Sequence, residues 1–260
     1  MKDRYQTALS RRSGKEFVSM SKTGLYDMHC HILPEVDDGS RSMEESLKML
    51  EMEYNDGVRH IILTPHFRYD MFETPLEKIK AQYEQLKSEA GKKWPDLSLH
   101  LGCELHSSLD MVSCLKAGQR LTLAGSRYVL LEFSGRDPRS TIIERTMDLL
   151  NHGYKPILAH IERYPPFHDR TGIDQIEELK DAGAFMQVNA DTISGKDGFR
   201  SKRFAKKLLK NDLIDFVGTD AHRTDTRTPG LLKAYEQVKK TMGEDYADWL
   251  FIERPSALTK

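Results

Sequence analysis

The segment from Leu25 to Pro34 carries two histidines, His29 and His31, on either side of Cys30. If this segment is a β-strand, alternate side chains point to opposite faces, so both imidazoles lie on the same face. Two imidazoles on one face, just before a turn that contains Pro34, are well placed to bind a metal ion. The pair alone is weak support for a metal site, because paired histidines also occur as ordinary strand residues.

Further residues of the types that bind metal ions follow or end other predicted strands. They are Asp38 in the turn after the first strand, then His66, Glu104, Glu132, His160, Asp220 and His222. A buried carboxylate is costly unless it is paired or coordinates a metal, and Glu104, Glu132 and Asp220 each end an apolar run. The nine candidates are too many for a single ion, which takes about four to six ligands, and they suit two or three ions with a bridging carboxylate.

Each candidate also has an ordinary structural interpretation when it is taken alone. His66 follows Pro65 and could be a loop histidine, Glu132 could be a charge that faces water, and His160 could be a hydrogen-bonded core histidine. The metal hypothesis therefore depends on the whole set, and all nine candidates must meet at one place in the fold.

The apolar runs alternate with segments of helical spacing, which predicts parallel strands buried on both faces. The predicted strands are Leu25–His31, Val58–Thr64, Leu97–Glu104, Tyr128–Phe133, Pro156–Ile161, Ala184–Ala190 and Asp215–Asp220. The predicted helices are Ser42–Asn55, which opens with a capping box, Pro75–Ala90, Ser140–Asn151, Ile173–Ala182 and Arg200–Lys210. Seven strand–helix units favour a closed β/α barrel, with an open doubly wound sheet as the alternative. In a barrel, functional residues collect at the C-terminal ends of the strands, which is where the nine candidates fall.

Length and charge limit the classes of protein that this chain can represent. Its 260 residues, with a formal net charge of −1, suit one globular domain over residues 25–260 and argue against nucleic-acid binding by bulk electrostatics. No apolar run is long enough to cross a membrane. Residues 1–24 are polar and basic and lack the apolar core of a secretory signal, so we expect a flexible N-terminal extension on a cytoplasmic protein. Three cysteines are too few for a disulfide framework.

A cluster of basic residues lies in the last predicted helix, Arg200–Lys210. Charges at these spacings usually form the solvated side of a helix. The cluster consists of Lys202, Arg203, Lys206, Lys207 and Lys210. We therefore assign it no role from the sequence.

Taken together, the motifs resemble one known superfamily. They are His29-x-His31, Asp38, Thr64-Pro-His66, Gly102-x-Glu104, Glu132, His160-x-Glu-Arg163-Tyr and Asp220-Ala-His222. This set resembles the polymerase-and-histidinol-phosphatase (PHP) superfamily. Within it, the HCHILPEVDDGS and HIERY stretches are similar to the bacterial tyrosine-protein phosphatases of capsule and exopolysaccharide operons.

The resemblance implies a distorted seven-stranded (β/α)7 barrel with a trinuclear metal site. One ion would be held by His29, His31, Glu104 and Asp220, a second by Glu104 as a bridge with Glu132 and His160, and a third by Asp38, His66 and His222. Imidazole and carboxylate ligands suit Mn most, with Fe, Zn or Co as further choices. The site would activate water for attack on a phosphomonoester. Arg163 and Arg227, three residues after His160 and five after His222, lie in loops of the predicted rim, where a guanidinium can bind phosphate oxygens and act in catalysis.

We therefore expect metal-dependent hydrolysis of phosphotyrosine on a protein. The resemblance implies that this protein is a bacterial tyrosine autokinase with a phosphorylated tail. Two alternatives stay open. The first is a PHP phosphoesterase that acts on a small metabolite such as histidinol phosphate. The second is a non-catalytic scaffold that binds metal and docks a kinase.

A second phosphatase motif, C-x5-R, occurs at Cys114–Arg120. In cysteine-dependent tyrosine phosphatases such a loop cradles phosphate with its backbone N–H groups and activates a thiolate. Here no histidine precedes Cys114 and no Ser or Thr follows Arg120, which argues against that chemistry. We predict that Cys114→Ser leaves turnover of a phosphotyrosine substrate unchanged. An inactive but folded Cys114→Ser protein would contradict the metal hypothesis and revive the thiolate one.

Overall fold

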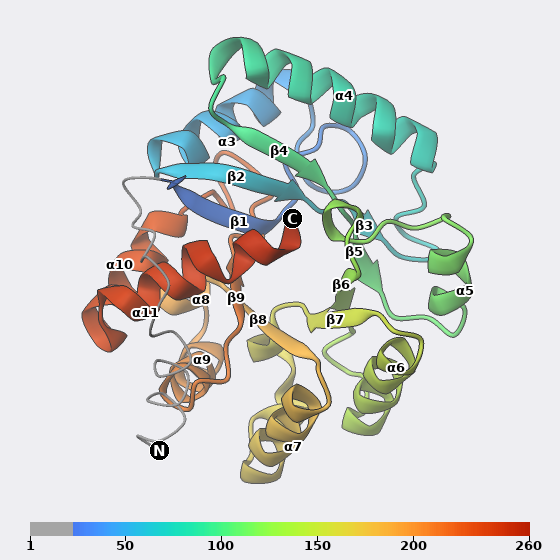
Figure 1. Ribbon diagram of the computed structural model, residues 1–260, viewed down its shortest axis with the longest axis vertical. Coiled ribbons are helices and arrows are strands. Elements are labelled where there is room, and N and C mark those ends of the chain that lie inside the picture. The colour runs from blue at the N-terminus through green and yellow to red at the C-terminus, as the bar shows by residue number, and fades with distance from the viewer. Residues whose placement is uncertain (1–22) are drawn as a thin grey trace.

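The computed structural model describes residues 23–260, in which parallel strands form a curled sheet with helices outside it (Figure 1). The strands are β1 (Leu25–Cys30), β2 (Val58–Leu63), β3 (His66–Phe67), β4 (Ser98–Leu101), β5 (Glu104–His106), β6 (Tyr128–Glu132), β7 (Lys155–Leu158), β8 (Phe185–Asn189) and β9 (Phe216–Gly218). The longer helices are α3 (Met43–Asn55), α4 (Leu76–Lys93), α6 (Arg139–Asn151), α7 (Arg170–Asp181), α9 (Phe199–Lys210) and α10 (Leu231–Met242). Shorter helical segments are α5 (Met111–Lys116), α8 (Ala190–Ser194), α11 (Glu244–Asp248), η2 (Ile161–Arg163), η3 (Pro165–Phe167) and η5 (Pro255–Leu258).

The strands form two sheet segments, β1-β2-β4 and β3-β5-β6-β7-β8-β9, in which all the pairs are parallel. β2 and β3 together occupy one strand position of the barrel, and β4 and β5 together occupy the next one. With these two interrupted positions, the nine strands occupy seven positions, as in the predicted distorted barrel. The distorted barrel is thus confirmed, and the open doubly wound sheet is wrong.

The barrel closes where β1 meets β9. The backbone N–H of His31 donates to the carbonyl of Ala221 at 2.8 Å, and that of Asp220 donates to the carbonyl of His29 at 2.7 Å. Asp27 strengthens this seam, because one of its carboxylate oxygens accepts the backbone N–H of Thr219 at 2.9 Å. Closure therefore brings the first and last candidate ligands of the chain side by side.

Several predicted boundaries were wrong, and the largest error is informative. The predicted strand Leu97–Glu104 breaks at residues 102–103, so β4 pairs with β2 while β5 pairs with β3 and β6. Gly102 lies at the break, where a Cβ would come within 2.7 Å of Leu123. The break turns Glu104 into register with His66. The predicted starts at Leu25, Val58 and Tyr128 are confirmed, the remaining strand ends differ by one to three residues, and α4 continues past the predicted stop at Ala90 to Lys93.

Local signals account for the helices that pack around the sheet. The predicted capping box of α3 is present in a shifted form. Ser42 Oγ accepts the N–H of Glu45 at 3.1 Å, but Glu45 Oε2 accepts the N–H of Arg41 at 2.8 Å and not that of the N-cap residue Ser42. The main hydrophobic core lies between the sheet and the helices. A second cluster, with Met28, Ile62 and Phe216, fills the barrel interior and is covered by Leu258 of η5.

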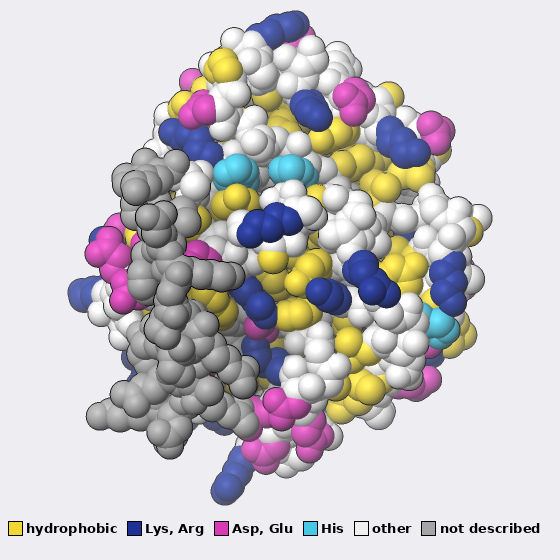
Figure 2. Space-filling view, viewed as in Figure 1, with side chains coloured by type: hydrophobic (Ala, Val, Ile, Leu, Met, Phe, Trp, Pro, Cys, Tyr) yellow, Lys and Arg dark blue, Asp and Glu magenta, His cyan; other side chains and the backbone are white. Residues whose placement is uncertain are grey.

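The predicted extension at residues 1–24 lies outside the described residues, apart from Thr23 and Gly24. On the face shown in Figure 2, acidic and basic side chains are interspersed between hydrophobic ones. Within residues 23–260, no helix is both long and apolar enough to span a membrane.

Gly218 is the residue of β9 that allows the closing strand to lie directly against His29. A Cβ at this position would lie 2.5 Å from the Cβ of His29 and 3.1 Å from its backbone nitrogen. We expect Gly218→Ala to lower the free energy of unfolding by about 1–3 kcal/mol, because the β1–β9 seam must move apart. Gly91→Ala is the matched control: Gly91 lies in α4 with nothing within 4 Å of an added Cβ, so it should raise the free energy by about 0.5–1 kcal/mol. Urea unfolding measures both changes, and equal stability of the two variants would contradict this packing argument.

Candidate metal centre

The nine candidate ligands meet at one end of the barrel, where the strands finish. They come from β1 and the loop after it (His29, His31, Asp38), from β3 (His66), β5 (Glu104) and β6 (Glu132), and from the loops after β7 (His160) and β9 (Asp220, His222). Most of these side chains are buried; Asp38 is exposed, and His66 and Glu132 are partly buried. The parallel strands bring them together because all the C-terminal ends lie at the same mouth of the barrel.

Glu104 lies at the centre of the cluster and is fully buried. Its Oε2 lies 3.2 Å from the Nε2 atoms of both His29 and His31 and 3.0 Å from Nδ1 of His66. Its Oε1 lies 2.9 Å from Nε2 of His160. Burial alone would raise the pKa of Glu104, but the imidazoles of His29 and His66 outweigh it and hold the pKa well below its usual range.

Three of the histidines direct one ring nitrogen outward to an oxygen and the other inward. Nδ1 of His29 faces the side-chain oxygen of Gln187 at 3.3 Å, Nδ1 of His31 faces Asp37 at 2.9 Å, and Nδ1 of His222 faces the carbonyl of Asp220 at 2.9 Å. When the rings are neutral, these Nδ1–H groups donate outward and the Nε2 lone pairs point into the cluster. Histidines that bind a metal ion are held in this manner.

The inward-facing atoms fit a cation. The Nε2 atoms of His29 and His31 lie 3.3 Å apart, so two lone pairs face each other when both rings are neutral. Buried oxygens of Glu104, Glu132 and Asp220 have no hydrogen bond. Burial would lower the pKa of His31, but the surrounding carboxylates raise it well above its usual range. The negative charge of the carboxylates that raises the pKa of His31 also attracts a divalent ion.

The possible ligand atoms form three overlapping groups, in each of which they lie within 4.8 Å of one another. The groups are His29, His31, Glu104 and Asp220; His31, Asp38, His66 and His222; and His66, Glu104 and Glu132. His160 is outside these groups but lies 3.8 Å from Glu132 and, as described, close to Glu104. The buried cluster thus has room for more than one ion, with shared carboxylates and imidazoles.

Asp220 connects this cluster to the two predicted arginines. Its Oδ1 faces His31 at 3.4 Å, while its Oδ2 accepts Nη1 of Arg163 at 2.8 Å, Nη2 of Arg227 at 2.7 Å and the amide of Asn189 at 2.8 Å. Burial alone would raise the pKa of Asp220, but His29, His31 and both guanidinium groups lower it well below its usual range. The arginine side chains are 35% and 41% exposed, so they form the rim of the cluster.

Three residues at this rim have a left-handed backbone that side-chain-bearing residues rarely adopt. They are His160 (φ 35°), Asp220 (φ 55°) and Arg227 (φ 49°). Such a conformation costs about 1 kcal/mol or more at each position and persists only where the surrounding structure enforces it. In the described part of the chain, these are three of the seven non-glycine residues with positive φ, so side-chain placement at the mouth carries a cost in backbone energy.

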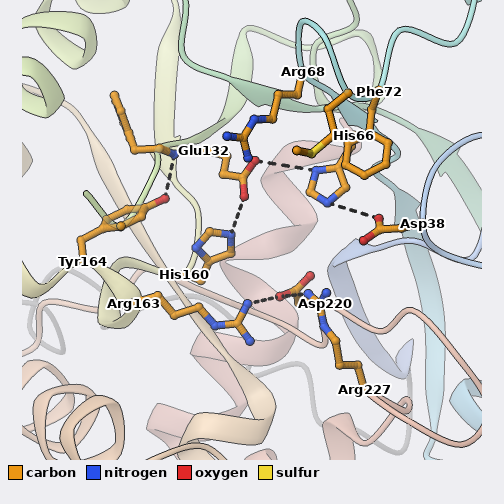
Figure 3. Close-up of a pocket in the computed structure, with 13 residues that line it drawn as sticks. Asp38, His66, Arg68, Phe72, Glu132, His160, Arg163, Tyr164, Asp220 and Arg227 are labelled. Carbon is orange, nitrogen blue, oxygen red and sulfur yellow. Dashed lines mark hydrogen bonds and ion pairs between the residues drawn. The ribbon is translucent and has the colours of Figure 1, made fainter. Parts of the chain in front are cut away.

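An open pocket of about 340 Å³ lies over the cluster (Figure 3). Its walls combine charge and apolar surface, because Arg68 and Phe72 approach from the side of His66, while Arg163 and Tyr164 approach from the side of His160. The ring of Phe72 stacks on that of His66 with centroids 5.0 Å apart. The pocket can therefore hold an anionic group against the cluster and an apolar ring beside it.

Several residues that orient the candidate ligands were not predicted as site residues. The side chain of Asp37 is buried, and its Oδ2 accepts both the Nδ1–H of His31 and the backbone N–H of His66, each at 2.9 Å. Gln187 accepts the N–H of His160 at 2.6 Å and donates to Asn189 at 2.9 Å. The signal was available: residues 187 and 189 are two apart at a strand end, the same spacing that singled out His29 and His31.

The C-x5-R motif does not form a phosphate-binding loop. Cys114 is buried inside helix α5, where its thiol donates to Asp110 at 3.4 Å. The guanidinium carbon of Arg120 lies 3.2 Å from the centroid of the Phe67 ring, so the arginine is engaged elsewhere. Both residues of the motif are thus engaged by other protein groups, which supports the expectation that Cys114 is not a nucleophile.

Bound divalent ions should stabilise the fold through this cluster, since its ligands come from both ends of the chain. At a free Mn²⁺ concentration about 100 times Kd, the gain is about 2.7 kcal/mol, or roughly 5–10 °C in Tm for a chain of this size. We expect Glu104→Gln to abolish most of this shift, while Glu84→Gln, an exposed control on α4, retains it. Thermal unfolding of chelator-treated protein with and without Mn²⁺ checks this, and a full shift in Glu104→Gln would contradict the central role of Glu104.

Comparison with known proteins agrees with this arrangement. The sequence model of the family described as "Capsular polysaccharide synthesis, CpsB/CapC" matches residues 25–260. The tyrosine-protein phosphatase CpsB of Streptococcus agalactiae is 35% identical over 241 residues, covering 91% of this chain and 98% of the relative. The CpsB of Streptococcus pneumoniae is 36% identical over 236 residues, covering 89% and 96%.

A solved structure from work on YwqE of Bacillus subtilis and CpsB of S. pneumoniae, described as unique metal-dependent tyrosine phosphatases, superimposes with a TM-score of 0.82. It is 29% identical, and the match covers 90% of this chain and 94% of that chain. The chain therefore belongs to the CpsB/CapC family of capsular polysaccharide synthesis.

Proposed function

We propose that the cluster around Glu104 holds two or three divalent ions and is the place where this chain hydrolyses phosphotyrosine on proteins. As a member of this family, the chain is a metal-dependent tyrosine-protein phosphatase of the CpsB type, linked to capsular polysaccharide synthesis. The observation that carries the location of the site is the inward convergence of imidazole and carboxylate atoms on Glu104.

We assign the nine ligands as the resemblance implied, with one adjustment. The first ion takes His29, His31, Glu104 and Asp220, and another takes Asp38, His66 and His222. A third takes Glu104 and Glu132 together with His160. Because His66 lies as close to Glu104 as His160 does, we allow His66 to be shared between two ions. Mn is our first choice of metal, with Fe, Zn or Co as alternatives.

The protein residues around the ligands prepare the site. Bound ions would supply Lewis-acid charge and lower the pKa of water at the reaction centre. Asp37 and Gln187 hold His31 and His29 with Nε2 directed inward. This hydrogen-bonded shell keeps the ligands in place without rearrangement during turnover.

Arg163 and Arg227 bind the oxygens of the phosphate in this proposal and act as the catalytic arginines. Each already anchors to Asp220 through one nitrogen, and Nη1 of Arg227 also lies 2.8 Å from Nε2 of His222. A guanidinium has five N–H groups, so further donors stay available at the rim. Donors fixed beforehand stabilise charge that develops on phosphate oxygens. The loss of one such donor typically costs about 10²–10³ in rate.

The mixed walls of the pocket suit an aryl phosphate. Phe72 and Tyr164 supply apolar surface beside the cluster, and Arg68 adds a third positive charge to the same opening. The pocket is open, so a tyrosine that is part of a protein chain can enter it. These features favour phosphotyrosine over a small polar metabolite such as histidinol phosphate.

We propose a bacterial tyrosine autokinase, through its phosphorylated tail, as the protein substrate. We also propose that the enzyme acts in the cytoplasm, because Cys30, Cys103 and Cys114 are free and buried, as suits a reducing compartment.

Removal of metal tests the reaction. We expect the purified protein to contain two or three equivalents of divalent metal per chain by elemental analysis and to lose phosphotyrosine-peptide hydrolysis with a chelator. Activity should return with Mn²⁺, and kcat/KM should be higher for the phosphotyrosine peptide than for histidinol phosphate. A higher kcat/KM for histidinol phosphate would favour the metabolite phosphatase, and metal-loaded protein that hydrolyses neither compound would favour the non-catalytic scaffold.

Substitution of single ligands tests the residue assignment. We expect His160→Ala or Asp220→Ala to abolish turnover while the circular dichroism spectrum stays like that of the wild type, because each change removes a ligand without opening the main core. His152→Ala, an exposed histidine at the end of α6, serves as control and should leave turnover intact. Near-normal activity of His160→Ala or Asp220→Ala would count against our ligand set.

A further inference from the structure

A basic groove, separate from the pocket over the metal cluster, runs along α9. It has a volume of about 820 Å³ and is lined by five cations, Arg200, Arg203, Lys206, Lys207 and Lys210, together with Pro165, His168, Asn211 and the buried Phe204. All five cations are exposed. This 12-residue helix carries six basic residues, five of which line the groove, whereas the net charge of the whole chain is −1.

The cations of this groove are not neutralised by the protein. In the part of the chain that the structure describes, none of the five lies within 4.0 Å of a carboxylate oxygen. Asp169 lies in the field of Lys207, but its carboxylate is already bound by Arg139 at 2.8 Å and by the N–H of Gly172 at 2.6 Å. The solvated-helix interpretation explains why these residues are exposed. It does not explain why they share a groove that contributes no acid of its own.

The groove adjoins the catalytic rim through two short segments. Pro165 and His168 follow Arg163 directly in the chain, and the ring of His168 contacts that of Phe204 with centroids 4.3 Å apart. Asp197, two residues before α9, lies 3.7 Å from Arg163. Phe199, the first residue of α9, is 78% exposed beside this junction. A chain that enters the pocket at Arg163 can therefore continue along α9.

Resting on the proposed function, we infer that this groove binds an acidic segment of the substrate protein next to the phosphotyrosine. A helix of this length is about 18 Å long, which an extended peptide spans with about five residues. Acidic side chains of that segment would pair with the row of cations, and an apolar residue of it can contact Phe199. Each exposed ion pair contributes little binding energy, so the groove affects substrate choice only through the combined energy of several pairs. High salt screens these pairs and should remove the preference.

The test compares three peptides that carry the same phosphotyrosine: one with five acidic residues before it, one with five after it, and one with neutral residues on both sides. We expect one of the acidic peptides to exceed the neutral one by about tenfold in kcat/KM, through a lower KM, and this preference to fade in 0.5 M salt. In the double variant Arg203→Glu with Lys207→Glu, the preference should disappear. Hydrolysis of a small aryl phosphate, which is too short to reach α9, reports on the metal centre of the variant.

A matched control makes the same change of charge elsewhere: Lys87→Glu with Lys93→Glu on α4 should retain the preference. Equal kcat/KM of the wild type for all three peptides would overturn the inference but leave the phosphatase assignment standing. A wild type that hydrolyses none of the peptides would overturn both. An equal loss against the small aryl phosphate and the acidic peptide would also overturn the inference, because the variant would then act through the metal centre. Tighter binding of an oligonucleotide than of the acidic peptides would assign the groove to nucleic acid instead.

Discussion

The structure depends on one buried charge, the carboxylate of Glu104 among four imidazoles. A carboxylate in the interior is stable only with compensating positive charge, and here that charge must come from protons on the histidines or from bound cations. The geometry favours cations, because Gln187 and Asp37 orient two of these histidines, His29 and His31, from outside. Without ions this cluster would be a destabilising element in the centre of the barrel mouth. With ions it joins strands from both ends of the chain.

The distortion of the barrel is related to the need to surround the buried carboxylate of Glu104 with imidazoles. A continuous third strand would keep its pairing with β2, whereas the break at Gly102 lets β5 pair with β3 and places Glu104 opposite His66. The β1–β9 seam completes the arrangement by setting Asp220 against His29, with Gly218 allowing the close approach. Strain at His160 and Asp220 indicates that the loops after the strands are also held in place by the cluster. The strands are thus irregular and the loops strained at the end of the barrel where the candidate ligands meet.

Much of this arrangement could be predicted because strand periodicity and residue type are local. The apolar runs indicated seven barrel positions, and the residues that end them included all nine that meet at the mouth. What could not be predicted depends on contacts between distant segments: the break at Gly102, the left-handed backbone at Asp220 and the support of His31 by Asp37. Helix α10 is different, because Leu231, Ala234, Tyr235 and Val238 have helical spacing and the sequence signal was simply not used. The basic residues of α9 were read correctly as exposed, but a linear pattern cannot indicate a groove or its nearness to Arg163.

The most direct test of the central claim is anomalous X-ray diffraction from crystals of the protein grown with Mn²⁺. The account predicts two or three anomalous peaks at the barrel mouth, with a carboxylate oxygen of Glu104 about 2.0–2.3 Å from at least one of them, as oxygen ligands of divalent ions usually are. Peaks that lie elsewhere on the molecule, or a Glu104 side chain that contacts only protein atoms in the metal-loaded crystal, would contradict it.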